Sequence, residues 1–215
     1  SLRKVAKEDF ARMEVLGQFN LGFIIASLGQ DVYILDQHAS DEKYRFETLQ
    51  QTTRINSQRL VVPHDMHLEA PDEMVVAENL EIFRASGFDL EVRPDEEAGS
   101  RVRLLAIPFT KGTVFGAADV HEMLCLLREN PGVPCRPSRV SAMFASRACR
   151  SAIMIGTVLN QQQMVEVKNH MGTMEQPWNC PHGRPTMRHL YDLAPVLDQP
   201  KRAARYEYKG PAVVR

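Results

Sequence analysis

The sequence contains no long apolar stretch. The longest one, Leu21 to Leu28, is interrupted by Gly22 and Ser27 and is far shorter than the roughly 18 residues that a membrane-spanning helix needs. We therefore expect that the chain does not span a membrane. Its composition of 44% hydrophobic and 25% charged residues is typical of a globular protein. An initiating Met and a signal-peptide apolar region are also missing, so we expect a piece of a longer protein.

Cysteines, basic charge and phosphate-binding loops are scarce too. Four cysteines are too few for the disulfide framework of a secreted protein, which predicts a reducing compartment where a thiolate can bind a metal. A net charge of −1 does not indicate a dedicated nucleic-acid-binding module, because such modules carry a basic excess. No Gly-rich phosphate loop is present, so we expect no ATP site. Basic residues are concentrated in two places, which form either a solvated face or a face toward phosphate: Arg136, Arg139, Arg147 and Arg150, and Arg184, Arg188 and His189.

The first fifty residues predict a hairpin followed by a helix. Two apolar runs, Val15 to Leu28 and Val32 to Leu35, flank the turn Gly29-Gln30-Asp31, and their β-branched and aromatic residues favour strands. Ser40 can cap a helix that runs to about Gln51, with acidic residues in its first turn. A junction between a strand and a helix is therefore expected at residues 36–42.

The middle of the chain shows a different pattern of short strands and amphipathic helices. Strands are predicted at residues 60–62, 88–93 and 101–107, and helices at residues 71–86 and around a stripe of Val120, Met123, Leu124 and Leu127. We interpret residues 55–134 as a subdomain inserted into another one, which residues 1–54 and 135–215 form from both chain ends. The fold class that this predicts is α/β (α+β).

Two further helices begin at capping signals. Ser138 can cap the first, and Asn160 with Gln163 resembles a capping box for the second, which ends at Gly172. Residues 201–215 are expected to be poorly ordered unless something binds them.

Three side chains suited to metal binding lie at the expected junction of strand and helix. Residues two apart on a strand share a face, so Asp36 and His38 are expected to point the same way, and the helix brings Glu42 back over His38. The alternative is a surface hydrogen bond or a core histidine, because a His four residues before a Glu is common. Asp36 would bind a metal or orient an attacking water. Glu47 is rotated away from the metal-facing side, so we expect a supporting role for it.

Cysteines supply the other candidates. Cys180 and His182 are separated by one Pro and followed by a Gly, so a stiff loop holds a thiolate and an imidazole close together, as zinc sites require. Cys149 is a third candidate. The alternatives are a buried thiol beside an exposed His and, for Cys149, ordinary core packing. We predict that Cys125 is a core residue and leave Cys135 open.

Together these residues predict a dinuclear metal site. His38, Glu42, Cys149, Cys180 and His182 are one ligand too many for a closed tetrahedral zinc site, whereas two ions sharing Glu42 would use them all. Two ions roughly 3.5 to 4 Å apart activate a water and stabilise the leaving oxygen when a phosphodiester is cut, which predicts a nuclease. One rival is a structural zinc module for dimerisation. Another is a zinc deaminase, whose His-x-Glu and Pro-Cys-x-x-Cys spacing is absent.

Three motifs, in this order, resemble those of the MutL homologues. Asp36-Gln37-His38-Ala39, followed by Glu42 and Glu47, is similar to the endonuclease signature of that family. Ala148-Cys149-Arg150 and Cys180-Pro181-His182-Gly183-Arg184-Pro185 are similar to its two companion motifs. The resemblance covers nearly the whole chain and is closest to the post-meiotic-segregation type, the catalytic subunit of eukaryotic MutL-alpha.

The resemblance implies a metal-dependent endonuclease that nicks double-stranded DNA during mismatch repair in the nucleus. It implies an inner α/β dimerisation subdomain with an outer one inserted, two Zn²⁺ ions, and Mn²⁺ or Mg²⁺ for activity. The partner would be a second MutL homologue in a heterodimer, whose extreme C-terminus reaches the site. The ATPase of the family lies in an N-terminal domain that this chain does not contain. Four residues are expected to support the metal ligands without binding metal: Gln37, Glu47, Arg150 and Arg184.

Residues 58–63 also resemble the sliding-clamp contact of this family. In Gln58-Arg59-Leu60-Val61-Val62-Pro63, the residues expected to bind the clamp are Gln58, Leu60 and Pro63. The alternative is an ordinary edge strand that ends at Pro63. The position of the segment after the endonuclease helix favours the clamp.

Overall fold

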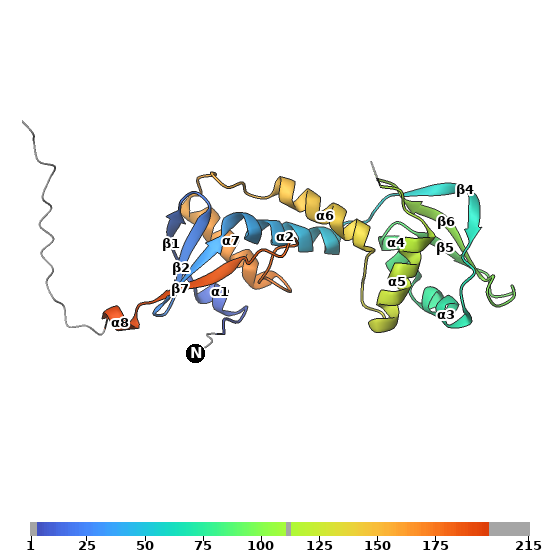
Figure 1. The fold of residues 1–215 in the computed structure, drawn as a ribbon, viewed down its shortest axis with the longest axis horizontal. Coiled ribbons are helices and arrows are strands. Elements are labelled where there is room, and N and C mark those ends of the chain that lie inside the picture. Colours follow the sequence, from blue (N-terminus) through green and yellow to red (C-terminus); the bar gives the residue numbers. More distant parts are fainter. Residues whose placement is uncertain (1–3, 111–112, 198–215) are drawn as a thin grey trace, which may run out of the picture.

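The computed structural model describes residues 4–110 and 113–197, which contain two antiparallel sheets with helices against each (Figure 1). The first sheet has the order β1-β2-β3-β7 and consists of β1 (Glu14–Phe19), β2 (Phe23–Leu28), β3 (Asp31–Asp36) and β7 (Met187–Asp192). Leu35 pairs with Met187, so the two ends of the chain share this sheet. Helices α1 (Asp9–Arg12) and α7 (Gln161–Thr173) pack together beside it, and α8 (Ala194–Leu197) follows β7.

The second sheet is formed by the middle of the chain. Its order is β4-β6-β5, with β4 (Ser57–Asp65), β5 (Asp89–Val92) and β6 (Val102–Pro108). Alternate residues of β6 are buried, as the two-residue period of a strand with one covered face requires. The covering helices are α3 (Ala70–Glu78), α4 (Leu80–Ala85) and α5 (Ala117–Glu129).

Two long helices, α2 (Gln37–Thr52) and α6 (Ser138–Ser151), lie side by side between the sheets (Figure 1). Phe46 of α2 and Phe144 of α6 pack into the hydrophobic core of the second sheet. Ile24, Leu35 and Met171 belong to the separate core of the first sheet. The predicted mixed fold is confirmed, while the subdomain boundaries at residues 54 and 134 stay a prediction.

The start of α2 differs from the prediction. The helix begins at Gln37, with Asp36 as its N-cap, and the Asp36 carboxylate accepts a hydrogen bond of 2.8 Å from the amide of Ala39. Ser40 is therefore inside the helix and does not cap it. Asp caps a helix as well as Ser does, and Asp36 comes first along the chain. His38 and Glu42 consequently share one side as residues one helical turn apart, and the strand argument for Asp36 and His38 was wrong.

Other local predictions are confirmed or corrected by the structure. The hairpin of β2 and β3 and the capping box of Asn160 with Gln163 are confirmed. The apolar run from residue 15 to residue 28 is two strands, because the chain turns at Asn20 and Leu21. The helix predicted over residues 71–86 breaks at Asn79, and α6 begins at Ser138 with Pro137, not Ser138, as its N-cap.

The prediction that Cys125 is a core residue was wrong, because its side chain is exposed. Helix α5 buries Val120, Met123, Leu124 and Leu127, and the position after Leu124 is rotated by about 100° out of that stripe. Residues 201–215, which we expected to be poorly ordered, lie outside the described part of the chain. Within the described part, no helix is both long and apolar enough to cross a membrane.

Candidate metal centre

Three separate segments bring the candidate ligands together. His38 and Glu42 lie on the first two turns of α2, Cys149 lies near the end of α6, and Cys180 and His182 lie in the loop between α7 and β7. Among the described residues, two sets of donor atoms lie within 4.8 Å of one another: His38, Glu42 and Cys149, and Glu42, Cys180 and His182. Glu42 belongs to both sets, so the geometry agrees with the expected convergence on one shared carboxylate.

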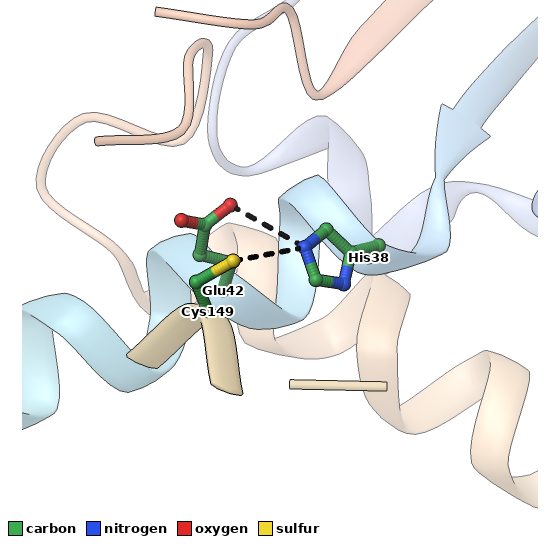
Figure 2. Close-up of side chains that lie close together, drawn as sticks. All are labelled: His38, Glu42 and Cys149. Atoms are coloured by element: carbon green, nitrogen blue, oxygen red, sulfur yellow. Dashed lines mark hydrogen bonds and ion pairs between the residues drawn. The ribbon is translucent and has the colours of Figure 1, made fainter. Parts of the chain in front are cut away.

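The first set faces the space between α2 and α6 (Figure 2). The Nε2 atom of His38 is 3.6 Å from the sulfur of Cys149 and 3.7 Å from Oε2 of Glu42. His38 and Cys149 are held there by the packing of the two helices, in which Ala148 is fully buried. Figure 2 shows the thiol and the carboxylate both directed at the same ring nitrogen.

The orientation of His38 is set by its other nitrogen. Nδ1 lies 2.9 Å from the carbonyl oxygen of Ile153, to which it can donate a hydrogen bond. Asp41 holds Ile153 in place, because the carboxylate of Asp41 accepts a hydrogen bond of 2.8 Å from the amide of Ile153. A ring whose Nδ1 donates to a carbonyl presents the Nε2 lone pair to a metal, and histidines that bind metal in other proteins make the same kind of hydrogen bond.

The second set depends on a tight turn in the loop before β7. The amide of Cys180 donates to the carbonyl of Arg184 at 2.8 Å, and Gly183 has a φ of 84°, a conformation that favours glycine. This turn directs the buried thiol of Cys180 and the half-exposed ring of His182 toward Glu42. The stiff loop expected from the sequence is therefore present.

The carboxylate of Glu42 is the unusual feature of the site. Glu42 is 0% exposed, and its Oε1 has no hydrogen-bond partner among the described residues. Nδ1 of His182 lies 2.6 Å from that oxygen, within ion-pair distance. Burial of an ionised carboxylate is costly unless positive charge or hydrogen bonds compensate for it. A cation that shares these lone pairs would supply that compensation.

One guanidinium also faces the site. Nη2 of Arg184 is 3.4 Å from Oε2 of Glu42. The pKa of Arg184 is raised, first by a hydrogen bond to Cys180 and then by the negative charges of Cys180, Glu42 and Asp36. The expected supporting position of Arg184 therefore agrees with its contacts, and Asp36 is close enough for its charge to be felt there.

The donor set fits zinc. Thiolate sulfur, imidazole nitrogen and carboxylate oxygen are the ligands that Zn²⁺ takes, and each set contains three such atoms. A four-coordinate ion in either set would have a position left for water or another ligand. Asp36 is not a member of either set. Its carboxylate accepts the hydrogen bond that caps α2.

Glu47 contacts the backbone of the loop that carries Cys180. Its carboxylate accepts hydrogen bonds from the amides of Glu175 at 2.7 Å and Gln176 at 3.1 Å, where the loop that carries Cys180 begins. The supporting contact is thus made far from the ligands themselves. Sequence reasoning missed Asp41 and Ile153, because no sequence signal marks a backbone carbonyl that a distant helix brings to a histidine.

The basic residues predicted to face solvent or phosphate have different environments. Arg139, Arg147 and Arg150 of α6 are exposed, as are Arg188 and His189 of β7. Arg136 is half-buried and donates hydrogen bonds to the carbonyls of residues 50, 53 and 85, and its burial lowers its pKa. Arg136 is therefore structural and does not belong to the exposed basic face.

The segment that resembles a clamp contact lies in β4. Pairing with β6 is regular at Arg59 and resumes at His64, so the residues between them bulge out of the ladder. Val61 and Val62 are exposed, at 101% and 75%, whereas Leu60 packs partly against the second core. The segment lies in an edge strand, as the alternative interpretation proposed, but the strand continues to Asp65 and does not end at Pro63. Its bulge also displays apolar side chains to solvent.

Fold and site together define a class: an α+β protein in which a buried carboxylate lies between two pairs of Cys and His side chains. Residues 16–159 match the MutL C terminal dimerisation domain. The chain belongs to this family.

Curated relatives support the assignment. The chain is 54% identical over 191 residues to the mismatch repair endonuclease PMS2 of Gallus gallus, which covers 89% of the chain and 22% of that protein. It is 52% identical over 194 residues to the protein of the same name of Homo sapiens, covering 90% and 22%. Identity to the DNA mismatch repair protein PMS1 of Saccharomyces cerevisiae is 50% over 196 residues, covering 88% and 22%. The chain therefore spans about a fifth of the length of these relatives.

Proposed function

We propose that this chain is the metal-dependent endonuclease and dimerisation part of a mismatch repair protein, and that it nicks double-stranded DNA in the nucleus. The observation that carries the proposal is the fully buried Glu42, which is shared by two sets of thiol and imidazole donors. Relatives that carry the name mismatch repair endonuclease support the choice of DNA as substrate. The exposed Arg147 and Arg150 of α6 would supply positive charge for the DNA backbone.

The residues divide the work by position. His38 and Cys149 would hold one Zn²⁺, Cys180 and His182 the other, and Glu42 would bridge them. Such a centre, with Mn²⁺ or Mg²⁺ in support of activity, supplies Lewis acidity and a water of lowered pKa. Asp36, at the N-terminus of α2, would orient the attacking water and accept its proton. Arg184 would orient the shared carboxylate through its contact with Oε2 of Glu42.

A structural zinc module is the rival, and the number of donors argues against it. A structural site closes its shell with four protein ligands, whereas each set here contains three among the described residues. The remaining position is what a reacting water, or a residue from a second subunit, requires.

The Asp36→Asn variant tests the endonuclease. Asn is as good an N-cap as Asp, so α2 and the fold should persist, while the negative charge is lost. We expect two bound zinc ions per chain, an unchanged unfolding temperature and loss of nicking of supercoiled plasmid with Mn²⁺ and the partner region. Cys180→Ala should instead lose metal together with activity. Normal nicking by Asp36→Asn would contradict the role of this carboxylate.

A second MutL homologue is the proposed partner, and an apolar surface is available for it. This apolar surface consists of exposed side chains at the turn between β1 and β2 and in the loop after α6: Phe19, Leu21, Met154, Ile155 and Val158. The two segments are joined by a hydrogen bond of 2.7 Å from the amide of Gly156 to the carbonyl of Leu21. Exposed apolar patches of this kind mark interaction sites.

Charge placed on this surface tests the heterodimer. Ile155→Asp should weaken binding to the C-terminal region of the second homologue at least tenfold, because a charge would be buried in the interface. Val114→Asp is the matched control, since Val114 is also exposed but lies far along the chain, before α5. Equal effects of the two variants in a titration would argue against this surface.

Clamp binding at residues 58–63 is the last part of the proposal. Leu60 also packs against the second core, so Leu60→Ala changes stability as well as the contact. Gln58→Ala is the sharper test, because Gln58 is exposed, and Arg59→Ala is its neighbouring control. We expect Gln58→Ala to lose clamp-stimulated nicking and keep basal nicking. Full stimulation in Gln58→Ala would exclude Gln58 from the contact.

A further inference from the structure

The loop between α6 and α7, residues 152–160, connects the metal centre with the apolar surface. Its start belongs to the centre: the carbonyl of Ile153 contacts His38, and the amide of Ile153 donates to Asp41. The next two residues, Met154 and Ile155, are 51% and 66% exposed and belong to the apolar surface. One continuous stretch of backbone thus contacts both sites.

Gln37 holds this stretch in place. Its side chain is fully buried, and Nε2 lies 3.1 Å from the carbonyls of Leu21 and Met154 and 3.4 Å from that of Thr157. Its Oε1 accepts a hydrogen bond of 2.8 Å from the side chain of Gln18 in β1. Two consecutive residues of α2, Gln37 and His38, therefore contact two consecutive carbonyls of the loop, those of Met154 and Ile153.

The turn that Gln37 contacts is held in a strained conformation. Asn20 and Leu21 have φ values of 48° and 47°, which Asn tolerates and Leu rarely adopts. Leu21 is kept there by hydrogen bonds to its carbonyl from Gln37 and Gly156. Its side chain is nevertheless 44% exposed, so burial does not explain the strain. Strain that the surroundings hold in place is often part of a functional site.

We propose that Gln37 is a positioning residue that couples the metal centre to the apolar surface, so that bound zinc and a bound second subunit strengthen each other. The inference rests on the proposed function above. A metal on Nε2 of His38 favours the ring position in which Nδ1 contacts Ile153, and Gln37 extends that order to Met154 and Leu21. A partner seated on Leu21 and Met154 orders the same backbone from the other end.

Coupling between two sites is reciprocal, which makes the inference quantitative. If zinc increases affinity for the partner by some factor, the partner must increase affinity for zinc by the same factor. Couplings of this kind are typically about 5-fold to 150-fold. Gln37 belongs to neither set of metal donors and its side chain is fully buried, so its variants report on the connection between the two sites.

The experiment measures the dissociation constant of the partner C-terminal region with zinc-loaded and zinc-stripped chain. Gln37→Met keeps the size of the side chain but removes its amide. Gln161→Met is the matched control, because the side-chain amide of Gln161 also donates to a backbone carbonyl, that of Val15 at 3.1 Å, but Gln161 is exposed and its hydrogen bond in the described structure goes to β1. Zinc affinity is measured in parallel by chelator competition, with and without the partner.

We expect zinc to tighten partner binding by about tenfold in the native chain and in Gln161→Met, and by less than about twofold in Gln37→Met. A native chain that binds zinc and nicks DNA, but binds the partner equally with and without zinc, would overturn this inference and leave the proposed function standing. A native chain that binds no zinc would instead overturn the proposed function. An unchanged ratio in Gln37→Met would also overturn the inference.

If Gln37→Met does not fold, hydrogen exchange in the native chain decides. Zinc alone should slow exchange at the amides of Gly156 and Leu159, which donate to the carbonyl of Leu21 and the side chain of Gln18. Unchanged exchange at both amides would contradict the coupling.

Discussion

Glu47→Gln should weaken zinc binding at a distance from the ligands. Glu47 is 8% exposed and holds the amides of Glu175 and Gln176 with one carboxylate oxygen each, at 2.7 and 3.1 Å. Oε1 also forms an ion pair with Lys43 at 3.1 Å. Gln has the same shape, but an NH2 group replaces one of the two carboxylate oxygens. That NH2 group then faces one of the two backbone N–H groups, and both are donors. One hydrogen bond is lost, and one donor is left without a partner.

The expected magnitude follows from that loss. A hydrogen bond to a charged group contributes about 1.5 to 3 kcal/mol. If the loop passes this loss on to Cys180 and His182, zinc affinity falls by roughly 10-fold to 150-fold, since 1.4 kcal/mol corresponds to tenfold. The range agrees with the roughly 10-fold to 100-fold effects of residues that support metal ligands in other proteins.

Competition with a chromophoric chelator measures the two zinc affinities separately. The ion held by Cys180 and His182 should weaken, while the ion held by His38 and Cys149 should weaken less. Glu81→Gln is the control, because Glu81 is an exposed glutamate on α4 and its ion pair in the described structure is local, with Arg84 at 2.7 Å. If Glu47→Gln binds both ions as tightly as Glu81→Gln does, the loop does not transmit the loss and the reasoning fails.

Three further predictions concern the rest of the described chain. Leu21→Asn should raise the free energy of unfolding by up to about 1 kcal/mol, because Asn tolerates the positive φ at this position. It should also weaken partner binding, because an apolar side chain is removed from the apolar surface. A lower free energy of unfolding together with weaker partner binding would contradict the strain argument. Burial lowers the pKa of Lys168 from its ordinary 10.5, so the unfolded chain binds more protons below that pH and stability should rise as pH approaches 10.5. Chemical denaturation of Lys168→Met across this range should show a smaller rise, and equal slopes would refute the assignment. Cys125→Ser should leave the unfolding temperature within about 1 °C of the native value, because a surface substitution changes stability little; a larger fall would mean that the thiol is packed.

Features that depend on neighbours along the chain were predictable from the sequence. The hairpin after Gly29, the apolar stripe of α5 and the capping box at Asn160 are set by turn chemistry, helical period and side-chain caps within a few residues. The exposure of Cys125 was also within reach, because its position is off the stripe. The prediction that Cys125 is buried relied on its apolar neighbours in the sequence. It did not take into account the rotation of about 100° per residue along a helix.

The sequence by itself determined which donor types were available and in which three segments they lie, because the side chains and their order are properties of the chain. Only the tertiary structure decided that Glu42 is buried between both donor sets and that the carbonyl of Ile153 orients His38. These contacts join residues more than a hundred positions apart, such as His38 and Ile153. Helix packing fixes such distances, and the local pattern of a sequence contains no record of them.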